Sequence, residues 1–219
     1  MKEYSLQNCA RFSNIDIASR YPSEFRQGHD RDVREKNTIL YALKYIPAGS
    51  HILDLPCGTG RVAQLLIQQG YDVTAADRSH EMVMAAQKNL DPVPGKQLST
   101  IRYSQEDLIR GTSFNDKEFD AVICHRLFHH LIDPDIRIQA IRELHRIVTG
   151  TIIFSFFNSF SLNSGFRRIK LFVRGKIPTD RIPIRKKTII TELQSEGIDI
   201  IKILPVSRGI SPLCLIVAR

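Results

Sequence analysis

The sequence predicts an α/β fold: an open, doubly wound sheet that is mostly parallel and ends in an antiparallel hairpin. Two observations predict it. Between residues 50 and 157, short apolar runs typical of strands alternate with helical patterns. The last two apolar runs, 198–204 and 213–218, are separated by too few residues for a parallel crossover, which needs about a dozen residues or more. We therefore expect these two runs to pair as a hairpin.

Turn and capping residues bound the elements of the first half. Pro47 and Gly49 stop the first predicted helix, 30–46, in which Val33, Leu40 and Leu43 are expected to face inward. The next elements are a strand at 50–55, a helix at 61–69 ending before Gly70, and a strand at 71–76. Ser79 is a suitable N-cap for the helix predicted at 80–90.

The second half continues the alternation and then departs from it. Strands are predicted at 99–104, 119–124 and 151–157, and the last two are largely apolar, as strands buried on both faces are. Pro134 suits the first turn of the helix at 134–148. A helix at 186–196, stopped by Gly197, precedes the hairpin.

Length and composition fit one domain. The chain has 219 residues, 42% of them hydrophobic, enough for a full core. We treat 1–219 as a single domain with an N-terminal cap and helix at 1–47. The four cysteines are widely spaced and form no Cys-x-x-Cys pair, so we expect neither a disulfide framework nor a metal site. With no signal-peptide pattern at the N-terminus, these features favour a cytoplasmic location.

A glycine turn, Gly58-Thr59-Gly60, joins the strand at 50–55 to the helix at 61–69. Glycine lets the backbone bend sharply and lets a ligand approach the main chain closely. The helix that follows offers free backbone N–H groups in its first turn. The arrangement is typical of a nucleotide-binding α/β unit.

Carboxylates follow three of the predicted strands: Asp54, Asp77 and Asp107. The carboxyl ends of parallel strands meet at one edge of the sheet, where ligands bind. Asp77 lies 19 residues beyond Gly58, which suits a carboxylate that binds the hydroxyls of a ribose. Asp107 is placed to accept a hydrogen bond from an adenine amino group.

Two cofactors fit a glycine turn of this kind. Gly58-x-Gly60-x-x-Ala63 satisfies the dinucleotide fingerprint, so a nicotinamide enzyme is one alternative. Asp54 argues against it, because a pyrophosphate at the turn would meet a second negative charge. S-adenosylmethionine carries an ammonium and a sulfonium beside its ribose and adenine. It is therefore the predicted cofactor.

Three stretches resemble the class I S-adenosylmethionine-dependent methyltransferases of the small-molecule, type 11-like group. They are ILDLPCGTGRVAQLL, YDVTAADRSHEMVMAA and FDAVICHRLFHHL, and the resemblance runs from about Asn37 to the end of the chain. It implies a Rossmann-like seven-stranded sheet with an antiparallel hairpin at its end, and methyl transfer as the activity.

The resemblance also implies roles for individual residues. Asp54 and the glycine turn would hold the methionine end of the cofactor, and Asp77 its ribose. The full cofactor-binding set is Asp54, Gly58, Thr59, Gly60, Asp77, Arg78, Met82, Asp107, Leu108 and Cys124. Pro56 departs from the family, which usually has glycine there. Proline fixes φ and removes an N–H donor, but we expect binding to survive.

The histidines after the strand at 119–124 are candidate catalytic residues. His125 and His129 are four residues apart, but no suitably spaced carboxylate completes a zinc pattern. Methyl transfer mainly requires alignment of the acceptor, and an acceptor hydroxyl must also lose a proton. Histidine titrates in the right range, so His129 or His130 is predicted to be the general base. A buried or solvated histidine without a catalytic role is the alternative.

The positive charge of the chain is concentrated in one segment. Of 31 basic and 23 acidic residues, 166–187 holds nine Lys/Arg and only Asp180 as an acid, so the rest of the chain is balanced. This segment belongs to an insertion or lid, 158–187, expected after the fifth strand. Its pattern suits a lid over an anionic small or lipid-linked acceptor, an anionic membrane surface, or an RNA backbone. We rank RNA below the other two.

The predicted function is methyl transfer to an oxygen of a small or lipid-linked acceptor. The sequence after the fourth strand, Cys124-His125-Arg126-Leu127, lacks the Asn/Asp-Pro-Pro-aromatic motif of enzymes that methylate amino groups of adenine and glutamine. An RNA or protein methyltransferase is the first alternative, and a non-catalytic cofactor-binding scaffold is the second. The expected location is cytoplasmic, with peripheral membrane attachment through 166–187 as a variant.

Overall fold

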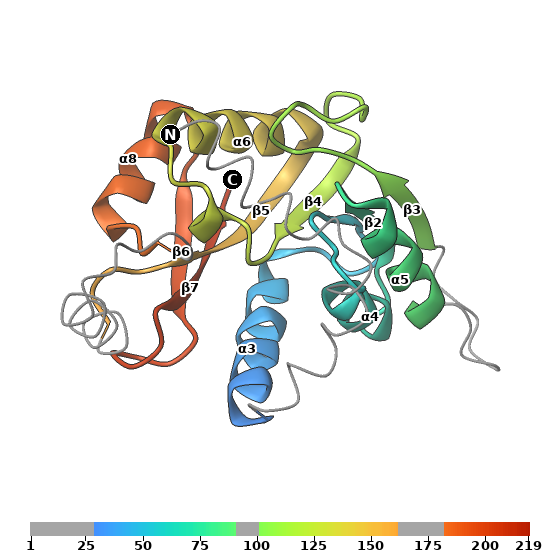
Figure 1. Cartoon of the computed structure of the whole chain (residues 1–219), viewed down its shortest axis with the longest axis horizontal. Helices are drawn as coiled ribbons and strands as arrows, with labels where there is room; N and C mark the ends of the chain where they lie inside the picture. Colours follow the sequence, from blue (N-terminus) through green and yellow to red (C-terminus); the bar gives the residue numbers. More distant parts are fainter. Residues whose placement is uncertain (1–28, 91–100, 162–181) are drawn as a thin grey trace.

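The computed structural model describes residues 29–90, 101–161 and 182–219, which build a seven-stranded sheet with the order β3-β2-β1-β4-β5-β7-β6 (Figure 1). The order runs outward in both directions from β1 and β4, as in a doubly wound fold. The strands are β1 (His51–Asp54), β2 (Asp72–Asp77), β3 (Ile101–Gln105), β4 (Phe119–Cys124), β5 (Val148–Phe157), β6 (Ile200–Pro205) and β7 (Leu213–Ala218).

Strand directions confirm the predicted fold class. β1 pairs in parallel with both β2 and β4, and the parallel pairing continues to β3 and β5. β7 is antiparallel to β5 and to β6, which makes it the reversed strand of a closing hairpin. The central strands are almost fully buried, whereas the edge strands β3 and β6 are partly exposed.

Helices cover both faces of the sheet and divide the core in two. On one face, α6 and α8 pack over β4 and β5, with Phe128 and Phe154 in ring contact. On the other, α4 and α5 pack over β1, β2 and β3, and α3 packs over β6 and β7. The helices are α3 (His29–Ala42), η3 (Leu43–Tyr45), α4 (Arg61–Gln68), α5 (His80–Leu90), η4 (Phe128–His130), α6 (Pro134–Ile147) and α8 (Lys186–Ser195). In the described part of the chain, no helix is long and apolar enough to cross a bilayer.

Two predicted helix starts are confirmed by their capping bonds. The Ser79 hydroxyl accepts a hydrogen bond from the Met82 N–H at 3.2 Å, at the start of α5. At the start of α6, the Asp133 carboxylate accepts from the Asp135 N–H at 3.0 Å, and Pro134 occupies the first turn.

The predicted inward face of the first helix was wrong at one position. Val33 is 41% exposed, whereas Glu35 is fully buried together with Ile39 and Leu43. Positions 35, 39 and 43 follow the i, i+4 spacing of one helical face. The apolar pattern pointed to Val33 because a glutamate was not expected in the core.

Gly60 is the residue that lets α4 begin close to α5. Its φ of 88° is left-handed, and a Cβ there would lie 2.8 Å from Leu90 Cδ1 and 3.3 Å from Ala86 Cβ. Both neighbours are buried on α5. The close approach of the two helices therefore depends on the missing side chain.

We expect Gly60→Ala to lower the free energy of unfolding by about 1 kcal/mol or more beyond Gly209→Ala. Both changes place alanine in the left-handed region, at a cost of about 1–2 kcal/mol. Gly209 (φ 71°) has open space around a Cβ, so only Gly60→Ala adds overlap. Urea denaturation measures both, and equal losses would contradict the packing argument.

Candidate functional site

The glycine turn lies at the carboxyl edge of the sheet, between the ends of β2 and β4. The Leu55 N–H donates to the Ile123 carbonyl at 3.1 Å, and the Cys57 N–H donates to the Ala76 carbonyl at 2.7 Å. Pro56, which has no N–H, stands between these two donors and follows a cis peptide bond. The turn is thus attached to both neighbouring strands before it reaches Gly58.

Two buried carboxylates hold the turn by its backbone. Asp54 Oδ2 accepts from the Ala63 N–H at 2.9 Å, and Asp77 Oδ2 accepts from the Gly58 N–H at 2.9 Å. Asp77 Oδ1 accepts from the Ser79 N–H at 2.9 Å. The structure therefore brings Asp54, Gly58 and Asp77 together, as predicted, and gives each aspartate a structural task as well.

Burial makes both aspartates reluctant to ionise. Burial, together with the smaller effect of the nearby Asp77 charge, raises the pKa of Asp54 to about 8, against the hydrogen bond from Ala63. Burial also raises the pKa of Asp77, against its backbone hydrogen bonds from Ser79 and Gly58. A cation beside Asp54 would favour its charged form, whereas an anion would oppose it.

Asp54 also has spare hydrogen-bonding capacity. Its Oδ1 is buried and has no hydrogen-bond partner among the described residues. A buried acceptor of this kind is costly unless a donor reaches it. At Gly58, no atom lies within 4 Å of where a Cβ would stand, so the turn borders open space. Both features fit a ligand that brings a cationic donor to the turn.

The predicted adenine-side residues form a second group. Asp107 Oδ1 accepts from the Ile109 N–H at 3.0 Å, and Oδ2 lies 3.3 Å from Arg78 Nε, which links the ends of β2 and β3. Thr59 lies in the turn, where its carbonyl accepts from Asn89 Nδ2 at 3.0 Å. The remaining predicted residues have almost fully buried side chains: Met82, Leu108 and Cys124.

Glu35 of α3 is the centre of an ion cluster that sequence reasoning missed. Its Oε1 lies 2.5 Å from an Arg61 guanidinium nitrogen and 2.5 Å from His125 Nε2. Arg126 bonds both oxygens, at 2.9 Å to Oε1 and 2.6 Å to Oε2. Arg61 also pairs with Asp32 at 2.6 Å. This Glu35 cluster ties α3 to the start of α4 and to the end of β4.

The basic neighbours of Glu35 compensate for the burial of its carboxylate. Burial alone would raise the pKa of Glu35, but the hydrogen bonds and charges of His125 and Arg126 hold it well below its usual range. Burial lowers the pKa of His125, against the pull of Glu35, and Arg61 and Arg126 lower it further. Glu35 is therefore ionised near neutral pH.

Arg126 reaches Glu35 from an uncommon backbone conformation. Its φ of 63° lies in the left-handed region, where few non-glycine residues occur. The Arg126 N–H donates to Ser155 Oγ at 2.7 Å, which fixes the bend to β5. Strained residues of this kind gather at functional sites, and this one lies at the edge that carries the glycine turn.

The predicted catalytic histidines are buried in η4, just beyond β4. The His129 ring stacks on Phe157 with centroids 4.0 Å apart, and the His130 ring lies 4.2 Å from His129. The Ile182 N–H donates to the His129 carbonyl at 3.0 Å. His129 thus lies against the end of β5 and is hydrogen-bonded to Ile182, which belongs to the predicted lid, 158–187. Residues 162–181 of that lid, with most of the basic segment 166–187, lie outside the described residues.

A signal for Glu35 did exist in the sequence. In the predicted helix at 30–46, a glutamate occupies the i, i+4, i+8 series that continues with Ile39 and Leu43. An acid on an apolar helical face indicates a buried partner, because an unpaired buried carboxylate is costly. The identity of its partners could not be read from the sequence, since they lie 26 and 90 or more residues away.

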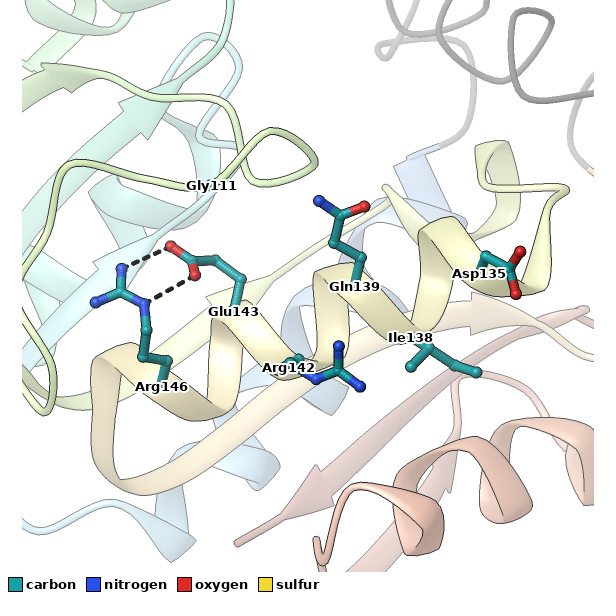
Figure 2. A pocket seen from close by; sticks show the side chains of 7 residues that line it. All are labelled: Gly111, Asp135, Ile138, Gln139, Arg142, Glu143 and Arg146. Carbon is teal, nitrogen blue, oxygen red and sulfur yellow. Dashed lines mark hydrogen bonds and ion pairs between the residues drawn. The ribbon is translucent and has the colours of Figure 1, made fainter.

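A pocket of about 520 Å³ lies on α6, apart from every predicted site residue (Figure 2). Figure 2 shows Arg146 and Glu143 one turn apart on α6 and paired with each other, and Arg146 also pairs with Asp116 at 2.6 Å. Arg142 is paired with Glu196 at 2.9 Å. The charged residues that line the pocket are paired with one another or with neighbouring segments and stabilise α6. We therefore do not place the active site in this pocket.

Comparison with known proteins bears out the resemblance. Residues 52–150 match the family model described as a methyltransferase domain. A putative methyltransferase, YqeM, from Bacillus subtilis is 32% identical over 124 residues, which cover 55% of this chain and 48% of that protein. A ubiquinone biosynthesis O-methyltransferase from Xanthomonas axonopodis is 34% identical over 98 residues, covering 45% and 39%. The chain spans less than half the length of these relatives.

Solved structures show the same fold. The magnesium protoporphyrin IX methyltransferase of Synechocystis, solved with bound S-adenosylhomocysteine, has a TM-score of 0.66 at 23% identity and covers 88% of this chain and 83% of its own. A Leishmania major S-adenosylmethionine-dependent methyltransferase has a TM-score of 0.70 at 12% identity, covering 99% and 83%. At these identities the likeness establishes the fold.

We expect Glu35→Gln to lower the free energy of unfolding by about 3 kcal/mol, because it leaves three donors around a neutral amide. The value is at the low end for a broken buried ion pair because Arg61 and Arg126 are partly exposed. Glu118→Gln, at an exposed glutamate, is the matched control and should cost less than about 0.5 kcal/mol. Urea denaturation measures both. A Glu35→Gln protein as stable as the control would contradict the role of the cluster.

Proposed function

We propose, from the match of residues 52–150 to the methyltransferase-domain family model, that the chain transfers the methyl group of S-adenosylmethionine to an oxygen of a small or lipid-linked acceptor. The observation that carries the cofactor is the unpartnered Asp54 Oδ1, buried beside an open glycine turn. It requires a donor, and a cationic donor suits its raised pKa. The ammonium of S-adenosylmethionine is such a donor.

The residues at the strand ends fit the rest of the cofactor. Each Asp77 oxygen accepts one backbone N–H, and a carboxylate oxygen can accept about two hydrogen bonds. Asp77 therefore retains capacity for ribose hydroxyls. The bound cofactor would supply an activated methyl group, and the chain's task is to align the acceptor with it and exclude water.

The acceptor side is the space beyond β4 and β5. The Glu35 cluster fixes His125 and Arg126 just after β4, and η4 follows directly. We assign His129 or His130 as the base that takes the acceptor's proton, since both sit at this edge and imidazole is the side chain that most often serves as a general base. Oxygen as the target is supported by the ubiquinone O-methyltransferases among the relatives.

The test is incubation of the full chain with S-adenosylmethionine carrying a labelled methyl group, together with cell extract separated into polar metabolites, lipids, RNA and protein. We expect label in the metabolite or lipid fraction. His129→Ala or His130→Ala should lower turnover at saturating acceptor about a hundredfold or more if that residue is the base.

Other outcomes would redirect the assignment. Label in RNA or protein would overturn the proposed acceptor. Cofactor binding without any labelled product would indicate a scaffold. Turnover within a few-fold of wild type for both alanine variants would contradict the histidine base.

The raised pKa of Asp54 predicts that cofactor affinity depends on pH, which tests the cofactor assignment separately. With a pKa of about 8 before binding, Asp54 is largely protonated at neutral pH and must ionise to pair with an ammonium. Affinity for S-adenosylhomocysteine should therefore rise with pH, by up to about tenfold per unit, and level off above about 8. Calorimetry in two buffers of different ionisation enthalpy should show proton release.

The matched control is Asp54→Asn, which keeps the shape and removes the titrating group. It should bind more weakly, and its pH dependence should be that of the ligand alone. If wild type and Asp54→Asn show the same pH dependence, Asp54 does not pair with the ammonium.

A further inference from the structure

Two neighbouring loops at the carboxyl edge expose apolar side chains. Phe160, just after β5, is 77% exposed, and Ile210, between β6 and β7, is 52% exposed. The loops are joined where the Asn158 N–H donates to the Pro212 carbonyl at 2.7 Å. A single exposed hydrophobic residue needs no explanation, but two on adjoining loops make a surface that water disfavours.

The same corner of the molecule is cationic. Arg208 is exposed in the loop with Ile210, and Arg185, Lys186 and Lys187 are exposed where α8 begins. The segments 158–161, 182–191 and 206–212 contain no acidic residue. We call residues 158–161, 185–187 and 206–212 the docking corner.

The lysines of the docking corner do not serve the stability of their helix. Lys186 and Lys187 occupy the first turn of α8, which has no acidic residue. A helix N-terminus carries partial positive charge, so cations there are unfavourable. The two positive charges therefore oppose the dipole of α8 rather than complement it.

The docking corner shares an edge with the candidate site. β5 ends at Phe157 and pairs there with Leu213, the first residue of the antiparallel β7. Both loops therefore emerge at the carboxyl ends of the parallel strands, as the glycine turn does. The Ile184 N–H donates to the Phe157 carbonyl at 2.7 Å, next to the ring that stacks on His129.

We propose that the docking corner binds an anionic lipid bilayer, with Phe160 and Ile210 entering the headgroup layer and the four basic side chains facing the lipid phosphates. Shallow apolar insertion beside Lys and Arg is the combination by which proteins attach to an anionic membrane surface. The inference rests on the proposed function in one respect: membrane binding would bring the acceptor side of the site to the headgroup layer, from which a lipid-linked acceptor would enter.

The experiment is sedimentation of the full chain with vesicles of phosphatidylcholine alone, or of equal parts phosphatidylcholine and phosphatidylglycerol, across a salt series and without cofactor. We expect binding to the anionic vesicles, at least about tenfold above the neutral ones and weakened by salt. Lys186→Gln/Lys187→Gln should lower it about tenfold or more, since each charge near the surface contributes about fivefold. Phe160→Ser/Ile210→Ser should also lower it about tenfold or more.

Matched controls come from α5. Met84→Ser removes an exposed apolar side chain and Lys88→Gln an exposed charge, and both should bind vesicles within about twofold of wild type. Equal binding to both vesicle types, or unchanged binding in the docking-corner variants, would overturn the proposal. So would tRNA binding that the same variants abolish while vesicle binding persists. Because no methyl transfer is measured, failure of the proposed function would leave this result intact and distinguishable.

Discussion

The structure of the site depends on two buried carboxylates, whose ionised forms are costly to remove from water. Asp54 and Asp77 end adjacent central strands, and each accepts a backbone N–H from the chain that follows β1. Burial raises the pKa of both, and the bonds to Ala63 and Gly58 only partly compensate. Asp54 retains a buried oxygen without a partner among the described residues. An edge built in this way is completed by a cationic donor, which is why the same geometry fits S-adenosylmethionine better than a pyrophosphate.

A third buried carboxylate extends this logic to the acceptor side. Glu35 is held by Arg61, His125 and Arg126. Its carboxylate therefore links α3, the start of α4 and the end of β4. Buried ion pairs are weak contributors to net stability, but they fix relative position, because removing one partner strands the others. The left-handed backbone at Arg126 belongs to the same arrangement. The cluster thereby couples the residues that follow β4 to the start of α4, directly after the glycine turn.

Much of the fold was predictable because it depends on local signals. Alternating apolar runs, glycine and proline stops, and the short connection before β7 were enough to predict a mostly parallel sheet and its reversed strand. The rule that ligands bind at the carboxyl ends of parallel strands was enough to place Asp54, Asp77 and Asp107 on one edge. The Glu35 cluster was not predictable in the same way, since its partners are brought together by the fold. Phe160 and Ile210 lie on loops that are brought together by strand pairing, so their common surface was not predictable either. The identity of the methyl acceptor could not be predicted, because no short sequence motif specifies it.

The central claim is that the turn after β1 receives a cation-bearing nucleoside. The most direct measurement is calorimetric titration of the full chain with S-adenosylhomocysteine and, separately, with NADH. S-adenosylhomocysteine keeps the ammonium, ribose and adenine, whereas NADH brings a pyrophosphate to the same turn. The account predicts that S-adenosylhomocysteine binds with one site per chain and that NADH gives no binding heat. Saturable binding of NADH with none of S-adenosylhomocysteine would contradict it.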